Sequence, residues 1–219
     1  MSGKNVLGRV LTVLGAVLIL AALSLVLYNY HHEHESKKTM DNVLVRLDNE
    51  IPDEPQKEEA SPFDVFDADD GYSDDSTAEV SDEDESLSLD GDEYIGIISL
   101  PTLDREYPIL KYWSYPNMNI APCRYDGIRA GRDLIICGHN YAGFFDNLSK
   151  LNSGDEIIFT DIKGRKFIYE VSYTELIDGW DTDSMYIGAR QDWDLTLFTC
   201  TWSGYSRVTV RAVLSEQRN

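Results

Sequence analysis

An uncharged apolar run of 18 residues, Val10 to Leu27, restricts the folding of this chain more than any other feature. As an α-helix, a run of that length can cross the hydrocarbon core of a membrane. Tyr28 and Tyr30 follow it, and tyrosine is enriched where a helix leaves a membrane. A cleaved signal peptide is the competing interpretation, but no small-X-small cleavage site directly follows Leu27. The run therefore predicts an uncleaved membrane anchor.

Charge divides the chain into unequal parts. The formal net charge is −20, and residues 41–93 contain 21 acidic but only two basic residues. Residues 94–219 contain 16 acidic and 13 basic residues, so this part is close to neutral. Because no basic stripe is present, nucleic-acid binding is not expected.

The charge pattern predicts three regions. Residues 1–30 are expected to form a short N-terminal tip, cytoplasmic if the family resemblance described below holds, and the membrane helix. Residues 31–93 are expected to form an acidic, low-complexity and disordered linker, since like charges oppose compaction. Residues 94–219 are long enough to bury one modest core and are expected to form the folded domain. A flexible linker of this length would carry that domain away from the membrane.

Two apolar patches interrupt the predicted linker, and either could dock on the domain. The first patch has helix-like spacing and consists of Val43, Leu44, Leu47 and Ile51. The second patch is a small aromatic-aliphatic group of Phe63, Val65 and Phe66.

The C-terminal part reads as a series of short apolar or alternating segments with Gly-rich turns between them. This pattern is typical of an all-β barrel or sandwich, with short helices around residues 115–119 and 144–151. The expected strands are Tyr94–Ser99, Glu106–Tyr112, Asp133–Cys137, Glu156–Asp161, Lys166–Ile177, Leu195–Cys200 and Arg207–Leu214.

Cys200, His139 and Arg207 are the residue types that thiol acyl transfer requires. Cysteine supplies a nucleophile, histidine moves a proton, and arginine offers several donors to an oxygen that gains negative charge. Each residue alone is more often structural than catalytic. Their order and context together favour a catalytic site. The order excludes a papain-like enzyme, in which the cysteine precedes the histidine.

Local geometry supports a shared site. If the segments ending at Cys200 and beginning at Arg207 pair antiparallel across residues 201–206, the two side chains lie on one face. His139 follows another apolar strand, and Gly138 lets the backbone turn just before it.

The segment Thr196-Leu197-Phe198-Thr199-Cys200, the following Arg207 and the upstream strand ending Gly138-His139 together resemble a sortase. Sortases are membrane-anchored cysteine transpeptidases, mainly of Gram-positive bacteria. The resemblance covers roughly residues 94–216 and implies a closed β-barrel of about eight strands. It also implies that Cys200 is the nucleophile, His139 the catalytic imidazole and Arg207 the transition-state arginine. The connection from Cys200 to Arg207 is shorter than in many sortases.

The resemblance further implies which molecules the protein acts on. These are secreted proteins with a C-terminal sorting signal, and the acceptor is an amine of a peptidoglycan precursor or a pilin. The catalytic domain would lie outside the cell on a single-pass anchor in the cell membrane. Thr199, Trp202 and Tyr205 are the expected substrate-binding residues, and no cofactor or obligatory metal is expected.

Two other functions are compatible with the sequence. One is a non-catalytic, membrane-tethered β-domain that binds cell-wall or pilin components. The other is a hydrolytic cysteine peptidase, which would transfer the acyl group to water.

Several smaller features have open interpretations. Cys123 and Cys137 are the two cysteines that could pair, and nothing in the sequence shows that they do. A metal site of Cys137, His139 and Cys200 lacks the usual ligand spacing. Asp181 and Asp183 are weak evidence for calcium. Residues 61–64, Ser-Pro-Phe-Asp, faintly resemble the lid of pilin-polymerising sortases, and a plain linker is the alternative.

Overall fold

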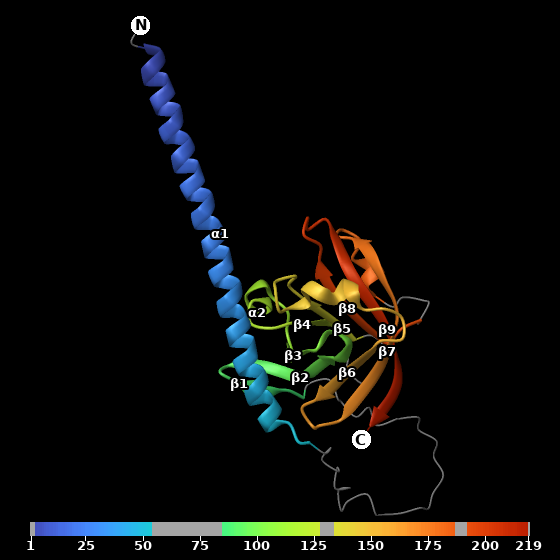
Figure 1. The fold of residues 1–219 in the computed structure, drawn as a ribbon. Coiled ribbons are helices and arrows are strands. Elements are labelled where there is room, and N and C mark those ends of the chain that lie inside the picture. The colour runs from blue at the N-terminus through green and yellow to red at the C-terminus, as the bar shows by residue number, and fades with distance from the viewer. Residues whose placement is uncertain (1–2, 54–84, 128–133, 187–191, 219) are drawn as a thin grey trace, which may run out of the picture.

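A long helix stands beside a β-barrel in the computed structural model, which describes residues 3–53, 85–127, 134–186 and 192–218 (Figure 1). The strands are β1 (Leu87–Leu89), β2 (Asp92–Leu100), β3 (Arg105–Leu110), β4 (Cys123–Asp126), β5 (Leu134–Gly138), β6 (Glu156–Asp161), β7 (Lys166–Asp178), β8 (Leu195–Cys200) and β9 (Ser206–Arg218). The helices are α1 (Gly3–Glu50) and α2 (Tyr115–Met118), with 3-10 turns η2 (Pro101–Leu103), η3 (Phe145–Lys150) and η4 (Asp183–Met185).

Eight of these strands close into a barrel. The order is β1-β2-β3-β4-β5-β8-β9-β7-β6, and a further pairing of β2 with β6 completes the ring. The short β1 pairs only with β2 and lies outside the ring. The β3–β4 and β5–β8 pairs are parallel, and the other pairs are antiparallel. The predicted closed, all-β barrel of about eight strands is therefore confirmed.

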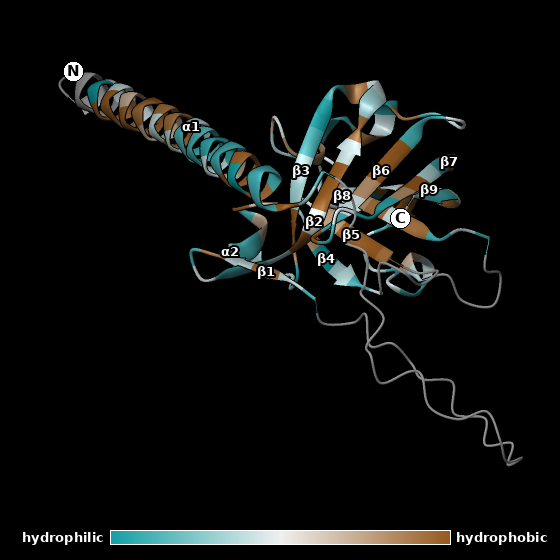
Figure 2. Ribbon diagram, turned by 90° about the horizontal axis from the view of Figure 1, so that it is seen from below, coloured by the Kyte–Doolittle hydropathy of each residue, from teal (hydrophilic) through white to brown (hydrophobic). Residues whose placement is uncertain are grey.

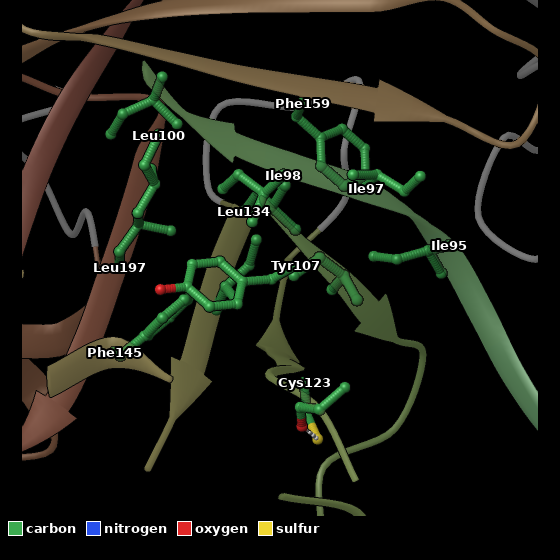
Figure 3. Packing of buried hydrophobic residues seen from close by; sticks show 14 of the residues in the cluster. Ile95, Ile97, Ile98, Leu100, Tyr107, Cys123, Leu134, Phe145, Phe159 and Leu197 are labelled. Atoms are coloured by element: carbon green, nitrogen blue, oxygen red, sulfur yellow. Dashed lines mark hydrogen bonds between the residues drawn. The ribbon is translucent and has the colours of Figure 1, made fainter. Parts of the chain in front are cut away.

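The barrel interior is filled by the apolar side chains that alternate along the strands (Figure 3). Tyr107 and Phe145 meet edge to face in this core, with ring centroids 5.2 Å apart. The Tyr107 hydroxyl also donates a hydrogen bond to the Phe144 carbonyl oxygen at 2.6 Å. Because Phe144 immediately precedes η3, this contact fixes one end of the barrel to the loop that follows β5.

The helix α1 differs from the sequence-based expectation, because it continues from the apolar run to Glu50 instead of ending near residue 30. Met40, Val43, Leu47 and Ile51 are buried in the core cluster of the barrel. The helical spacing of the first apolar patch thus correctly predicted docking. Burial of this stripe outweighs the repulsion between nearby acidic residues.

The predicted linker accordingly differs from the structure at both ends. Residues 31–50 belong to α1, and the strands begin at Leu87 rather than at Tyr94. The surface ion pair between Arg46 and Asp90 joins α1 to the turn between β1 and β2. The second apolar patch and the candidate lid, residues 61–66, lie outside the described residues.

The N-terminal half of α1 is a candidate membrane span. From Gly8 the helix is long and apolar enough to cross a membrane, and its most apolar window is not buried against other parts of the protein. Figure 2 shows the contrast between this apolar half and the more polar half beside the barrel. A helix that is apolar on all sides and exposed is suited to lipid surroundings.

Candidate active site

His139, Cys200 and Arg207 lie at the ends of three adjacent strands. Cys200 of β8 is the direct antiparallel partner of Arg207 of β9. On the other side of β8, the parallel pairing with β5 ends at Gly138 and Thr199. His139 and Cys200 are the next residues on these two strands. The backbone register therefore brings the three predicted catalytic residues into one row across β5, β8 and β9.

Alternation along β8 decides which side chains face outward. Leu195 and Leu197 are fully buried in the core, whereas Phe198 and Cys200 line a groove on the outer side of the barrel wall. Thr199 points away from that groove and is only 3% exposed. Its hydroxyl donates a hydrogen bond to the Gly138 carbonyl oxygen at 2.8 Å.

The position of Thr199 differs from the predicted substrate contact. A side chain next to Cys200 on a strand must face the opposite side, because successive strand residues alternate. Thr199 instead joins the end of β8 to the end of β5 and so positions the backbone before His139.

The groove beside Cys200 has a volume of about 170 Å³ and a wall of aromatic rings. Trp113 stacks on Tyr125 with centroids 5.4 Å apart, and Tyr125 meets Phe198 edge to face at 5.3 Å. Cys200 and Arg207 also line this groove. The groove thus places the thiol and the guanidinium beside a mainly aromatic surface.

The His139 imidazole is half-buried and lies outside the groove lining in the described part of the chain. It stacks on Tyr141 with ring centroids 4.3 Å apart and an interplanar angle of 15°. Burial lowers the pKa of His139, and the charge of His32 on α1 lowers it further. Both effects favour the neutral imidazole, the form that can accept a proton.

The anchor helix lies against the loop that carries His139. A Cβ added to Gly143 would be 2.7 Å from Cε of Lys37, so these two residues are in contact. Ser36 is buried beside this contact, and Glu33 raises the pKa of Tyr141 after the larger effect of burial. Sequence reasoning missed this arrangement, because this polar part of the helix was predicted as linker.

We expect a His32→Gln substitution to raise the pKa of His139, because it removes a nearby positive charge at acidic pH. The lowered pKa means that the unfolded chain, with a value near 6.5, binds more protons than the folded chain. His139 therefore lowers the free energy of unfolding as the pH falls through about 6.5. NMR titration of the His139 ring would measure the shift, and His31→Gln is the matched control. An unchanged pKa in His32→Gln would contradict the coupling.

Arg207 is held by its own hairpin. Its Nη1 donates to the carbonyl oxygens of Gly204 at 2.9 Å and Ser206 at 3.2 Å. Gly179 at the end of β7 allows close approach, since a Cβ there would lie 3.0 Å from Nη1. Every hydrogen bond described for this guanidinium uses Nη1. Nε and Nη2 therefore remain as donors for a ligand in the groove.

Arg211 is a site residue that sequence reasoning did not identify. It is 1% exposed and donates to Glu175 at 3.0 Å and to Thr196 at 2.8 Å. It also donates to the carbonyl oxygens of Ser184 and Met185 in η4, whose segment lines the groove. The polar positions 207, 209 and 211 alternating along β9 were the available signal.

Replacing Arg211 with methionine should loosen the groove wall, because the substitution removes every bond to η4 and leaves Glu175 without its partner. Arg211 is buried but Glu175 is 38% exposed, so water can solvate the remaining carboxylate, and the cost comes mainly from the lost bonds to Thr196 and to the carbonyl oxygens of η4. Thermal unfolding should therefore shift to markedly lower temperature, and peptide binding should weaken. Arg211→Lys keeps the charge but lacks the planar guanidinium, so its unfolding temperature should lie between those of the unmodified protein and Arg211→Met. Equal stability of Arg211→Met and the unmodified protein would contradict this role.

Of the remaining predicted residues, Asp181 lines the groove, whereas Trp202 and Tyr205 do not. Trp202 and Tyr205, the other expected substrate contacts, are 98% and 75% exposed on the loop between β8 and β9. Asp181 accepts hydrogen bonds from the backbone and hydroxyl of Ser184, so its carboxylate holds the start of η4.

The other two cysteines are buried free thiols. Cys123 and Cys137 are direct partners across β4 and β5. Burial raises the pKa of both thiols, that of Cys137 to about 12. Neither is therefore suited to act as a thiolate nucleophile at neutral pH, in contrast to the half-buried Cys200.

Comparison with known proteins identifies the domain. Residues 98–215 match the family model described as the sortase domain. No curated protein matches the chain.

Solved structures with the same fold include two sortases. Sortase A from Corynebacterium diphtheriae is 27% identical with a TM-score of 0.52, covering 57% of this chain and 62% of that chain. Sortase C1 of GBS Pilus Island 1 is 25% identical with a TM-score of 0.51, covering 56% of this chain and 64% of that chain. The matched region thus spans less than two thirds of either chain.

Proposed function

This chain belongs to the sortase family, and we propose that it is a cysteine transpeptidase whose nucleophile is Cys200. The observation that carries the proposal is the strand register that aligns His139, Cys200 and Arg207 at one end of the barrel. The aromatic groove next to Cys200 would hold the sorting segment of the substrate.

The reaction would begin with a neutral imidazole on His139. Because the pKa of His139 is lowered, its imidazole can accept the proton of the Cys200 thiol as the sulfur attacks a peptide carbonyl carbon. A carbon–sulfur bond forms and the oxygen becomes negatively charged. The unbonded donors of Arg207 would stabilise that oxyanion.

Collapse of this intermediate would break the peptide carbon–nitrogen bond and leave a thioester on Cys200. His139 would return its proton to the departing amine. An incoming amine would then attack the thioester and release the thiol, so that one peptide bond replaces another. Water would compete only when no amine is bound.

The partners follow from the family and from the candidate membrane span. We propose that the substrates are secreted proteins with a C-terminal sorting signal, and that the acceptor is an amine of a peptidoglycan precursor or a pilin. The apolar half of α1 would anchor the enzyme in the cell membrane, with the barrel outside the cell. One similar structure is named for a pilus island, which is consistent with a pilin acceptor.

Trapping of the acyl-enzyme tests this proposal. The full chain in lipid nanodiscs would be mixed with candidate sorting peptides, with and without an added amine, and analysed by mass spectrometry. We expect a thioester adduct on Cys200 and, with amine present, an amide product. An acid product that no amine diverts would identify a hydrolytic peptidase. An unreactive Cys200 with intact peptide binding would identify a non-catalytic binding domain.

A further inference from the structure

We propose that one end of the barrel rests in the interface of the membrane that α1 spans. The contact surface consists of four exposed side chains, here called the aromatic rim: Leu176, Trp180, Trp202 and Tyr205. The inference depends on α1 being the membrane anchor but not on the proposed catalysis.

The aromatic rim leaves unusually large apolar surfaces in water. Trp202 is 98% exposed, Trp180 89%, Tyr205 75% and Leu176 70%. Leu176 is on β7, and the other three are on the loops after β7 and after β8. These two loops are joined, because the Gly179 backbone N–H donates to the Tyr205 carbonyl oxygen at 2.7 Å. Clustered exposed apolar side chains of this size mark an interaction surface.

The rim lies at the end of the barrel that faces the membrane-spanning half of the anchor. Strand β9 runs from Ser206, next to the rim, to Arg218 at the C-terminus. In Figure 1 the C-terminus lies at the end of the barrel away from the N-terminal half of α1, so the start of β9 lies toward it. The rim therefore faces the plane in which the apolar run ends.

Helix geometry leaves little room between that end of the barrel and the membrane. In Figure 1 the barrel lies beside the C-terminal half of α1, and the charge of His32 on that helix is close enough to act on His139. His32 is five residues after Leu27, which corresponds to about 7–8 Å along a helix axis. The polar headgroup layer of one leaflet is itself roughly 5–8 Å thick. The facing end of the barrel would then lie close to this layer.

The chemistry of the rim suits lipid headgroups better than the hydrocarbon core. Tryptophan and tyrosine place an apolar ring and a polar tip at this depth. Asp178 and Asp181 flank Trp180, and their carboxylates accept bonds from the backbone N–H groups of Trp180 and Ser184. These charges would stay in the hydrated layer, so the contact should be shallow. It should also not require anionic lipids, since it contains acidic rather than basic residues.

Tryptophan quenching by brominated lipids tests this contact. The full chain would be reconstituted in phosphatidylcholine vesicles with bromine placed either near the headgroup end or near the tail end of the acyl chain. We expect strong quenching, greater with the shallow bromine. The Trp180→Phe/Trp202→Phe double variant should lose most of it. Trp113→Phe, which removes a groove tryptophan, should keep it.

The outcomes separate the possible occupants of the rim. Quenching that the double variant retains, or equal quenching in Trp113→Phe and the double variant, would overturn the proposal. Emission changes of Trp202 caused by a sorting peptide or soluble glycan, without lipid quenching, would assign the rim to substrate instead. Both rim tryptophans are nearly fully exposed, so their substitution should leave the fold intact, as far-UV circular dichroism can verify. Quenching in a Cys200→Ala background distinguishes failure of this inference from failure of the proposed catalysis.

Discussion

Replacement of Cys200 with alanine is expected to abolish thioester formation and to lower transpeptidation by about 10⁴-fold or more, as for other enzymes that lose a covalent nucleophile. The reason is that no other described thiol can substitute for it. Cys123 and Cys137 are buried, and burial raises the pKa of each. Mass spectrometry of the protein after incubation with a sorting peptide measures the adduct directly.

Cys123→Ala is the matched control for this experiment. Cys123 is fully buried on β4, outside the groove, so its loss should lower stability slightly and leave the adduct in place. Because Cys200 is only half-buried, the Cys200→Ala barrel should unfold at nearly the same temperature as the unmodified protein. Continued peptide cleavage by a folded Cys200→Ala protein would remove Cys200 from the mechanism.

Arg207→Lys is expected to lower kcat by about 10²–10³-fold, which is the usual cost of losing one donor to an oxyanion. The lysine ammonium can replace the bond from Nη1 to the hairpin carbonyls of Gly204 and Ser206. It cannot at the same time present the Nε and Nη2 donors to the groove. The loss should therefore appear in turnover and not in stability, as steady-state kinetics and thermal unfolding would show.

Arg105→Lys provides the comparison for that substitution. Arg105 is exposed on β3, and its guanidinium bonds only the neighbouring Asp104 carbonyl oxygen among the described contacts. The same chemical change there should leave kcat and KM unaltered. If Arg207→Lys behaved like Arg105→Lys, the arginine would have no part in stabilising the transition state.

Much of the barrel was predictable because its strands have clear local patterns. The bounds of β6 and β8 coincide with the predicted segments, and the short helical elements around residues 115–119 and 144–151 are present. The pairing of Cys200 with Arg207 also followed from the hairpin pattern. By contrast, β4 has only four residues, Cys-Arg-Tyr-Asp, and its pairing with β5 depends on tertiary contacts that no local pattern encodes.

The parts that sequence reasoning missed depend on which surface a side chain meets. Thr199 is next to the nucleophile in sequence but faces the opposite side of β8. Arg211 resembles any surface arginine until η4 folds over it. Ser36 and Lys37 have no apolar signal of their own. Ser36 is buried and Lys37 contacts Gly143 in the loop after His139 because the apolar stripe that follows them docks on the barrel.

If α1 anchors the protein in a membrane as proposed, its docking on the barrel also limits the distance from the membrane at which the barrel can act. A catalytic domain on a flexible linker could meet substrates at many distances from the membrane surface. A domain docked on a continuous helix would stay at one distance. The first buried residue of α1 after the apolar run, Ser36, lies nine residues beyond Leu27. A substrate protein would then have to present its cleavage site close to the membrane surface, at the level of the barrel, soon after its chain leaves the bilayer. The number of residues between a substrate's membrane anchor and its cleavage site would thus help to determine which secreted proteins are cleaved.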